Sequence, residues 1–384
     1  MSRAGTEAGA PADVAGGATF DDAHRRFQVA PMMEWTDRHY RVLARGLSRH
    51  ALLWSEMVVC DAVLHGDLER LLGRAPEDAP CVLQLGGSDP QKMARAAAIG
   101  AAFGYGEINV NVGCPSDRVQ AGRFGACLMA EPGLVGETVA RMRDAVQVPV
   151  TVKCRLGIDR DEGYEPLRDF VGAVAAHGCT RFVVHARKAW LDGLSPAENR
   201  TVPPLRYDHV YRLKREMPGL HVTINGGIDD LDAVREHLGH VDGVMLGRTA
   251  YQRPAFLAGV DAAVFPDLPG GRAPAADIDA LAEIARGYAL HMRARHAEGA
   301  RIASMARHLV ALFQEVPGAR LWRRRLSEGA RHASDPVALV EYALGAVQGA
   351  YVCEGGDAGA GPVPGPAGGS RMPASAVARG APAA

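Results

Sequence analysis

Cys114 is the residue with the clearest capacity for chemistry, and it lies in the segment Asn109-Val110-Asn111-Val112-Gly113-Cys114-Pro115. Gly113 and Pro115 end a strand-like run and are expected to hold the thiol in a fixed turn. A free thiol, with an ordinary pKa of about 8.5, stays protonated near neutrality and can act as an acid when a C=C bond is reduced. A nucleophilic thiolate and an inert buried cysteine are the alternatives.

Two glycine-containing turns predict a phosphate site. Gly226-Gly227 and Gly247-Arg248 lie at the ends of the last two strand-like runs of the chain, where backbone N–H groups and an arginine can bind a phosphate. Tight turns that need a positive φ are the alternative for the glycines. The sequence has neither a G-x-G-x-x-G motif after a strand nor a G-x-x-x-x-G-K-[ST] motif. We therefore assign the phosphate to flavin mononucleotide (FMN).

Three further polar residues at the ends of strand-like runs suit a flavin ring or its substrate. Lys153, in VTVKCRLG, could place an ammonium against the N1–C2=O edge of a flavin, or it could form a structural ion pair. Gln84 offers a donor and an acceptor to the pyrimidine edge of the ring, or it is an ordinary strand-end amide. His185, with Arg187 and Lys188 in HARKAW, could contact phosphate or substrate, or it is a hydrogen-bonded core histidine.

Eight β-rich apolar runs must position these residues, and helical segments alternate with them. The runs are Gln28–Met33, Leu52–Val58, Cys81–Leu85, Glu107–Gly113, Pro149–Leu156, Arg181–Ala186, His221–Gly226 and Gly243–Arg248. Nearly every run ends in polar or small residues, and such ends converge at the mouth of a (β/α)₈ barrel. We predict the α/β class, with a TIM barrel over residues 27–270. A doubly wound open sheet fits the same alternation, but it does not explain why the strand-like runs end in polar or small residues.

A second region follows Ala273-Pro274, and its apolar residues recur only at helical spacing. We predict a small all-helical C-terminal domain over residues 275–352. Between positions 286 and 332 it holds ten arginines and three glutamates, which makes a local basic patch. Residues 1–26 and 353–384 are rich in Ala, Gly and Pro and are expected to be disordered tails.

The overall composition excludes several classes of protein. The chain has 43 Lys and Arg residues against 44 Asp and Glu residues, so attraction to polyanions must come from a local patch. Its seven cysteines form no C-x-x-C pair and no short Cys/His spacing, so no metal site is predicted and reduced thiols in the cytoplasm are expected. No signal segment or membrane-spanning stretch is visible.

Several segments together closely resemble the tRNA-dihydrouridine synthase family, and most closely its A-type bacterial subfamily. They are APMMEWTDRHYR (30–41), LQLGG (83–87), EINVNVGCPSDRVQAGRFGACLM (107–129), VKCRLG (152–157), HARKAWLDGLSPAENR (185–200), INGGI (224–228) and GVMLGR (243–248). The resemblance runs from about Phe27 to about Ala350. Glu34, where Asp is expected, and Cys154, where Thr is usual, depart from the pattern without removing a named contact.

The resemblance implies roles for individual residues. Cys114 would be the proton donor and Asn111 would touch the target uridine, which is position 20, and also 20a, of the tRNA D-loop. NADPH would reduce the flavin, and hydride would then pass to uracil C6 while Cys114 protonates C5. The implied FMN contacts are Pro31, Met32, Met33, Gln84, Lys153, His185, Asn225, Gly226, Gly227, Gly247 and Arg248.

The basic helical region bears on the choice of substrate. Arg187, Lys188, Arg200, Arg307, Arg324 and Arg325 are the predicted tRNA contacts. A flavin barrel alone could act on a free pyrimidine, as the dihydroorotate dehydrogenase class does, and a tRNA chaperone would need no flavin. A uridine in a folded loop must be turned out of its stack before it can react. We expect a monomeric tRNA-modifying enzyme.

Overall fold

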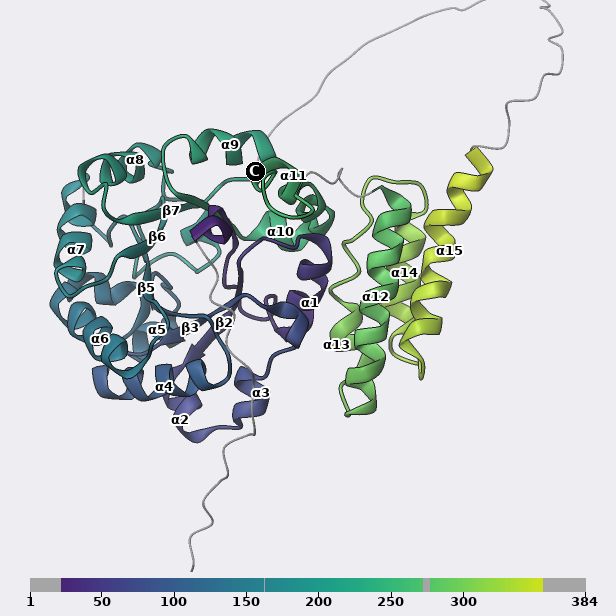
Figure 1. Cartoon of the computed structure of the whole chain (residues 1–384), viewed down its shortest axis with the longest axis horizontal. Helices are drawn as coiled ribbons and strands as arrows, with labels where there is room; N and C mark the ends of the chain where they lie inside the picture. Colours follow the sequence, from purple (N-terminus) through teal and green to yellow (C-terminus); the bar gives the residue numbers. More distant parts are fainter. Residues whose placement is uncertain (1–21, 162, 272–276, 355–384) are drawn as a thin grey trace, which may run out of the picture.

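The computed structural model describes residues 22–161, 163–271 and 277–354 (Figure 1). Eight parallel strands form one sheet in the order β1-β8-β7-β6-β5-β4-β3-β2. The strands are β1 Phe27–Val29, β2 Leu53–Val59, β3 Cys81–Gly86, β4 Glu107–Val112, β5 Val150–Arg155, β6 Arg181–His185, β7 His221–Asn225 and β8 Gly243–Leu246.

The sheet closes at Leu52, the residue before β2. Its N–H donates to the carbonyl of Phe27 at 2.9 Å, and its carbonyl accepts from the N–H of Val29 at 2.9 Å. The first and last strands of the order are thereby joined, since β1 also pairs with β8. The predicted TIM barrel is confirmed, and the open-sheet alternative is excluded.

Helices surround the barrel, as Figure 1 shows. They are α1 Arg38–Leu47, α2 Cys60–His65, α3 Leu68–Leu72, α4 Pro90–Ala102, α5 Asp117–Ala121, α6 Pro132–Ala145, α7 Glu165–Ala175, α8 Tyr207–Glu216, α9 Leu231–Leu238, α10 Arg248–Gln252 and α11 Val260–Val264. Short 3₁₀ turns are η1 Asp22–Arg26, η2 Pro76–Asp78, η3 Gly125–Ala130, η4 Glu198–Arg200 and η5 Pro254–Gly259. Helix α4 begins at Pro90, because Asp89 caps it and proline suits the first helical position.

The sequence prediction differs from the structure mainly at two points. The first strand ends at Val29, not Met33, because residues 30–36 leave the sheet as a loop. Residues 22–26, predicted as part of a disordered tail, form η1, and the buried Arg25 forms an ion pair with Glu107 of β4. At the other end α15 continues to Glu354. Residues 1–21 and 355–384, the rest of the two predicted tails, lie outside the described residues.

A chain of buried polar side chains crosses the barrel interior. Thr151 donates to Glu107 Oε1 at 2.7 Å, and Asn109 donates to Thr151 Oγ1 at 2.9 Å. Gln84 donates to Asn109 Oδ1 at 2.9 Å and accepts from Asn111 at 2.8 Å. Each buried polar group on this path therefore has a partner, as groups removed from water require.

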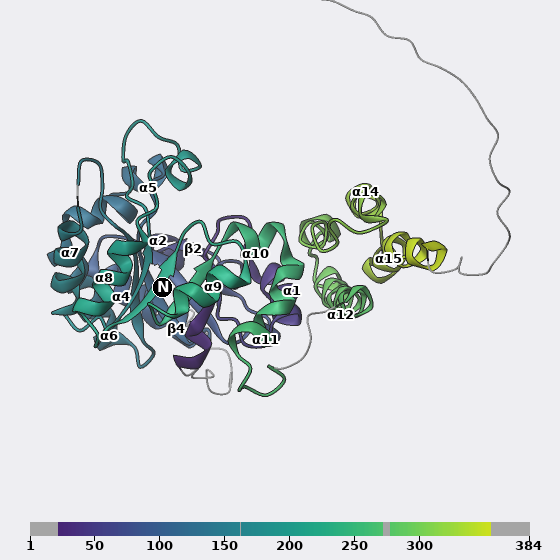
Figure 2. The same cartoon turned by 90° about the horizontal axis from the view of Figure 1, so that it is seen from above.

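Four further helices follow the barrel: α12 Ile278–Ala297, α13 Ile302–Ala306, α14 Ala319–Gly329 and α15 Pro336–Glu354. They lie beside α1 and not over the barrel mouth (Figures 1 and 2). Asp37 contacts both the barrel and the C-terminal helices. Its side chain caps α1, and its Oδ2 accepts from Arg307 Nη2 at 2.7 Å and lies 3.1 Å from His308 Nε2. Among the described residues, no helix combines the length and apolar character needed to cross a membrane.

Candidate active site

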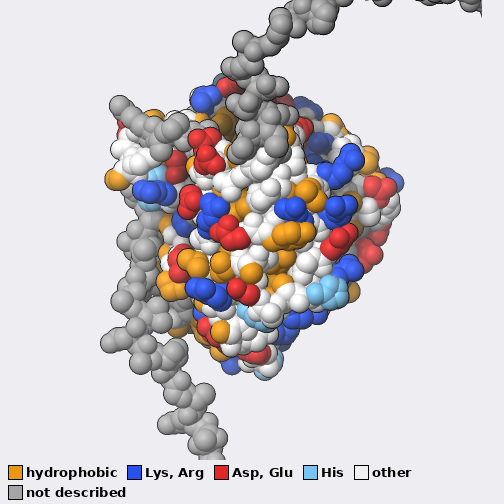
Figure 3. Space-filling model, turned by 90° about the vertical axis from the view of Figure 1, so that its right-hand side faces the viewer, with side chains coloured by type: hydrophobic (Ala, Val, Ile, Leu, Met, Phe, Trp, Pro, Cys, Tyr) orange, Lys and Arg blue, Asp and Glu red, His pale blue; other side chains and the backbone are white. Residues whose placement is uncertain are grey.

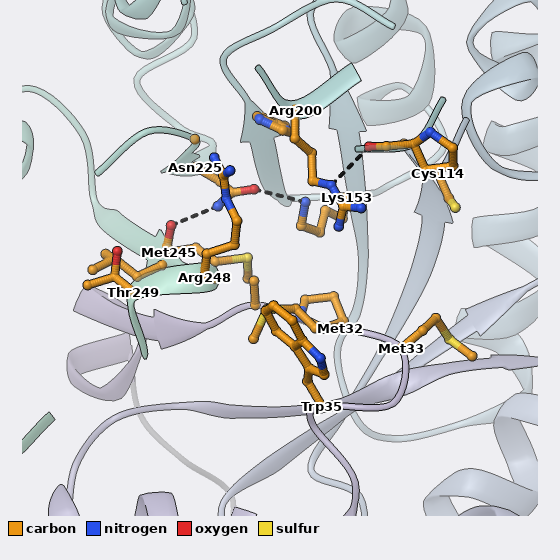
Figure 4. A pocket seen from close by; sticks show the side chains of 18 of the residues that line it. Met32, Met33, Trp35, Cys114, Lys153, Arg200, Asn225, Met245, Arg248 and Thr249 are labelled. Carbon is orange, nitrogen blue, oxygen red and sulfur yellow. Dashed lines mark hydrogen bonds between the residues drawn. The ribbon is translucent and has the colours of Figure 1, made fainter. Parts of the chain in front are cut away.

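A cavity of about 1100 Å³ opens where the strands end, and it collects most of the predicted site residues (Figure 4). Each of the eight strands, or the loop that follows it, contributes to the lining. The predicted residues found there are Pro31, Met32, Met33, Gln84, Asn111, Cys114, Lys153, His185, Arg200, Asn225, Gly226, Gly227, Gly247 and Arg248. The structure therefore brings these residues together at the barrel mouth, and their roles stay predictions.

Cys114 lies in a turn whose backbone is held from several sides. Its N–H donates to Asn111 Oδ1 at 3.0 Å, and its carbonyl accepts from the N–H of Ala126 at 2.9 Å. The partly exposed thiol faces the cavity, with Ser116 Oγ 3.5 Å from Sγ. The thiol is thus fixed in place and still accessible to a ligand.

Asn111 and Gln84 meet below this turn. The amide oxygen of Asn111 accepts the N–H groups of Gly113 and Cys114 at 3.1 and 3.0 Å, while its amide group donates to Gln84. Both side chains therefore belong to the buried polar chain and also line the cavity. Each keeps one N–H that makes no bond to the described protein atoms, so each can still donate to a ligand.

Lys153 is a half-buried cation without an anionic partner in the described chain. Its ammonium donates to Asn225 Oδ1 at 3.1 Å, and Asn225 in turn donates to the carbonyl of Met245 at 2.8 Å. Burial, followed by the charge of Arg155, lowers the pKa of Lys153 to about 8. An anionic ligand in the cavity would relieve this cost.

The neighbouring cations also favour a negatively charged ligand. Burial, and then the charges of Arg155, Lys153 and other arginines, lower the pKa of His185 well below its ordinary value, so the imidazole is neutral near pH 7. Arg200 and Arg248 line the same cavity. This donor set and volume fit a ligand that carries a phosphate group, which agrees with the FMN expected from the sequence.

The backbone conformation and the close neighbours of the two glycines after β7 favour glycine at both positions. Gly226 and Gly227 have φ values of 116° and 71°, and a Cβ on Gly226 would lie 2.6 Å from His185 Cδ2. A Cβ on Gly227 would lie 2.6 Å from Leu205. A larger residue would therefore strain the turn and displace its neighbours. Gly247 has a φ of −112°, so positive φ does not explain that glycine.

Five predicted tRNA contacts lie outside the cavity lining: Arg187, Lys188, Arg307, Arg324 and Arg325. Arg187 donates to the carbonyls of Thr201 and Pro203, and Lys188 lies over the ring of Trp190 at 4.7 Å. Arg325 donates to the carbonyl of Tyr342 at 2.6 Å. Arg324 is exposed on α14.

The fold neutralises part of the predicted basic patch. Arg286 pairs with Glu283 and Glu341 at 2.7 and 2.8 Å, and Arg295 pairs with Glu298 at 2.8 Å. Figure 3 shows acidic and basic side chains interspersed on the face of the molecule that it presents. The exposed arginines of α14, which are Arg320, Arg323 and Arg324, keep the basic character.

Several lining residues, among them Arg155, Trp35 and Gln314, were not assigned a role from the sequence. Arg155 is buried and donates to the carbonyls of Gly113, Lys188 and Asn199 at 2.9, 3.1 and 2.8 Å, which braces the Cys114 turn against the loop after β6. Trp35 and Gln314 also line the cavity. Arg155 lies in the motif VKCRLG and Trp35 in the motif APMMEWTDRHYR. Nothing in the sequence predicts that Gln314, between α13 and α14, lies beside the barrel.

The fold and the cavity define a barrel enzyme whose ligand site is built from the loops after the strands. Residues 28–348 match the family model described as dihydrouridine synthase (Dus). The chain belongs to this family.

Relatives support the same conclusion. The chain is 50% identical over 324 residues to the tRNA-dihydrouridine(20/20a) synthase of Synechocystis sp., covering 84% of this chain and 95% of that protein. It is 50% identical over 320 residues to the protein of the same name from Escherichia coli, covering 83% and 90%. Among solved structures, morphinone reductase superposes with a TM-score of 0.44 at 12% identity, over 60% of this chain and 84% of that one.

Proposed function

We propose that this chain is a tRNA-dihydrouridine(20/20a) synthase, which reduces the C5=C6 bond of uridines 20 and 20a in the tRNA D-loop. The relatives that share half its residues over nearly their whole length carry this name. The observation that carries the proposal is the placement of the Cys114 thiol on a fixed turn at the wall of a cation-lined cavity.

FMN is the proposed cofactor and NADPH its reductant. Lys153 and Gln84 would hold the ring, with Met32 and Met33 beside it. Pro31, His185, Asn225, Gly226, Gly227, Gly247 and Arg248 complete the proposed contacts. When bound and reduced by NADPH, FMN would supply the hydride for uracil C6.

The proton for C5 is proposed to come from Cys114. The hydride and this proton together saturate the double bond, and the thiolate then regains a proton from water. Asn111 would donate to the uracil with its remaining N–H, while Arg155 and the Asn111 carboxamide keep the turn in place. The cavity wall therefore supplies both orientation and the acid.

Binding of tRNA is proposed to use both parts of the chain. The barrel, residues 27–270, would be catalytic, and the helices of residues 275–352 would bind the nucleic acid through the exposed arginines of α14. Arg187, Lys188, Arg200, Arg307, Arg324 and Arg325 remain proposed contacts. The enzyme would act as a monomer in the cytoplasm.

Mass-spectrometric mapping of dihydrouridine in tRNA tests the function. Purified protein with FMN, NADPH and unmodified tRNA should convert positions 20 and 20a, and cells that lack the gene should lack dihydrouridine there. A protein that leaves tRNA unchanged but turns over free uracil or dihydroorotate would instead be a free-pyrimidine oxidoreductase. A colourless protein that binds tRNA without conversion would be a chaperone.

A further inference from the structure

Trp35 projects into the candidate active site although the chemistry described above does not use it. It lies in the loop after β1, three residues after Met32, and lines the cavity. Figure 4 shows its indole ring extending from this loop toward the middle of the pocket. A large aromatic side chain that is only partly buried at the mouth of a cavity offers a flat apolar surface to a ligand.

The ring is backed by a rigid aromatic support. Trp35 stacks on Tyr251 with ring centroids 4.4 Å apart and an interplanar angle of 10°. The hydroxyl of Tyr251 lies 3.2 Å from His308 Nδ1, and His308 pairs with Asp37 at 3.1 Å. The support therefore reaches the contact between the barrel and the C-terminal helices. A ring fixed from behind loses little freedom when a ligand stacks on it.

The indole N–H of Trp35 contrasts with those of two other tryptophans. Trp54 donates to Gln28 Oε1 and Trp322 donates to the carbonyl of Leu309, each at 3.0 Å, and both rings are buried. Within the described ranges, the indole N–H of Trp35 donates to no protein atom. A stacking surface and a spare donor on one side chain are together suited to a nucleobase.

Residues from both parts of the molecule lie on the cavity wall with Trp35. Gln252 ends α10, while Gln314 belongs to the segment just before α14 and donates to the Gln252 carbonyl. Helix α14 carries the exposed arginines Arg320 and Arg324. An RNA strand that runs from the reacting uridine toward α14 would thus pass this wall.

We infer that Trp35 forms a nucleobase-stacking subsite for the nucleotide next to the reacting uridine, with Gln252 and Gln314 at its edge. The inference rests on the proposed function, because it places a tRNA nucleotide in the cavity. Stacking accepts any base, so the subsite holds the flanking nucleotide without reading its identity.

Steady-state dihydrouridine formation with the FMN-loaded full chain tests this subsite. Trp35→Ala should raise the KM for tRNA roughly five- to one-hundredfold, which corresponds to the usual strength of one base stacked on an aromatic ring. Trp35→Phe keeps a stacking ring and should stay within about threefold of the wild type. Trp190→Phe, which keeps a ring beneath Lys188, is the control for loss of an indole outside the cavity lining. Flavin absorbance per chain is measured for every variant.

A modified tRNA separates direct stacking from an indirect effect. An abasic nucleotide beside the target uridine should raise the KM of the wild type to that of Trp35→Ala, and should leave the variant unaffected. The abasic nucleotide is placed on each side of the uridine in turn. If the variant and the abasic nucleotide raise the KM independently of each other at both positions, the inference is overturned. Loss of flavin from Trp35→Ala, which would assign the ring to the cofactor, also overturns it.

Two further outcomes are distinguished by the same measurements. Slower reduction of the flavin by NADPH in Trp35→Ala, with an unchanged KM for tRNA, would assign the ring to the dinucleotide and overturn the inference. If the wild type forms no dihydrouridine, the proposed function fails. Quenching of Trp35 fluorescence by tRNA, compared between the wild type and Trp35→Phe, then tests the subsite alone, and equal quenching overturns it.

Discussion

Replacing Cys114 with alanine should remove the acid and almost nothing else. The backbone of residue 114 is held by Asn111 Oδ1 and by the Ala126 N–H at 3.0 and 2.9 Å, and neither bond uses the side chain. The side chain has one weak polar neighbour, Ser116 Oγ at 3.5 Å, and it is partly exposed. We therefore expect a loss of stability below about 1 kcal/mol.

The loss of rate should be much larger. A positioned general acid contributes about 10²- to 10⁴-fold, which is roughly 2.7–5.4 kcal/mol of barrier height. The assay is a single turnover: the flavin is reduced with NADPH without oxygen, unmodified tRNA is added, and dihydrouridine is quantified by mass spectrometry while flavin absorbance is followed. Thermal unfolding is measured in parallel.

Cys127→Ala is the matched control, because Cys127 is also a partly exposed thiol and lies outside the cavity lining. It should react at the wild-type rate. A Cys114→Ala enzyme within threefold of the wild type would refute the acid role, and the Ser116 hydroxyl would be tested next. A variant that loses its flavin would instead show that the thiol helps to hold the cofactor.

Three other predictions follow from buried or exposed charges. Burial lowers the pKa of Lys153 to about 8, whereas the ordinary pKa of lysine is about 10.4. Between these two pH values the unfolded chain binds more protons than the folded chain. The free energy of unfolding of the flavin-free protein should therefore increase as the pH rises through this range. Lys153→Met should remove this gain in thermal unfolding from pH 7 to 10; parallel curves would contradict it. Arg155→Lys removes the guanidinium group that donates to three carbonyls. It should lower the free energy of unfolding by about 2–4 kcal/mol in chemical denaturation and slow dihydrouridine formation at least about tenfold, with the flavin retained. Turnover at the wild-type rate would show that Arg155 does not hold the Cys114 turn in its working position. Arg324→Gln should reduce the slope of the logarithm of the tRNA-binding constant against the logarithm of the salt concentration by about 0.7–0.9. Arg286→Gln is the control, because Arg286 already pairs with Glu341, and it should leave this slope unchanged. Equal slopes for the two variants would show that the tRNA binds to another surface.

The barrel could be predicted from the sequence because strand signals and strand-end residues recur in register along the chain. The Glu107 and Arg181 strands begin at the predicted residues, since apolar runs are local signals. The first strand was predicted too long, because Ala30 and Pro31 continue the apolar run while the backbone already turns into the cavity loop.

The sequence could place Cys114 and Lys153 at the cavity, because each lies at the end of a strand-like run, while their roles stay predictions. The site was not predictable where a side chain acts on distant backbone. Arg155 reaches a carbonyl 44 positions away in the sequence, and Arg307 reaches Asp37 across 270 positions. Pairings of this kind depend on barrel closure and helix packing, which no local pattern encodes. Counting charges along the sequence likewise missed that Glu283 and Glu341 neutralise Arg286.

The polar chain inside the barrel has a consequence for how the enzyme matures. The turn that carries Cys114 is held by Asn111, which is bonded to Gln84 of β3, and the chain continues through Asn109 and Thr151 of β5 to Glu107. These partners come together only after β3, β4 and β5 have paired, so a chain in which these three strands are still apart cannot hold the turn of Cys114 in this way. The onset of activity during refolding should therefore not precede the pairing of β3, β4 and β5.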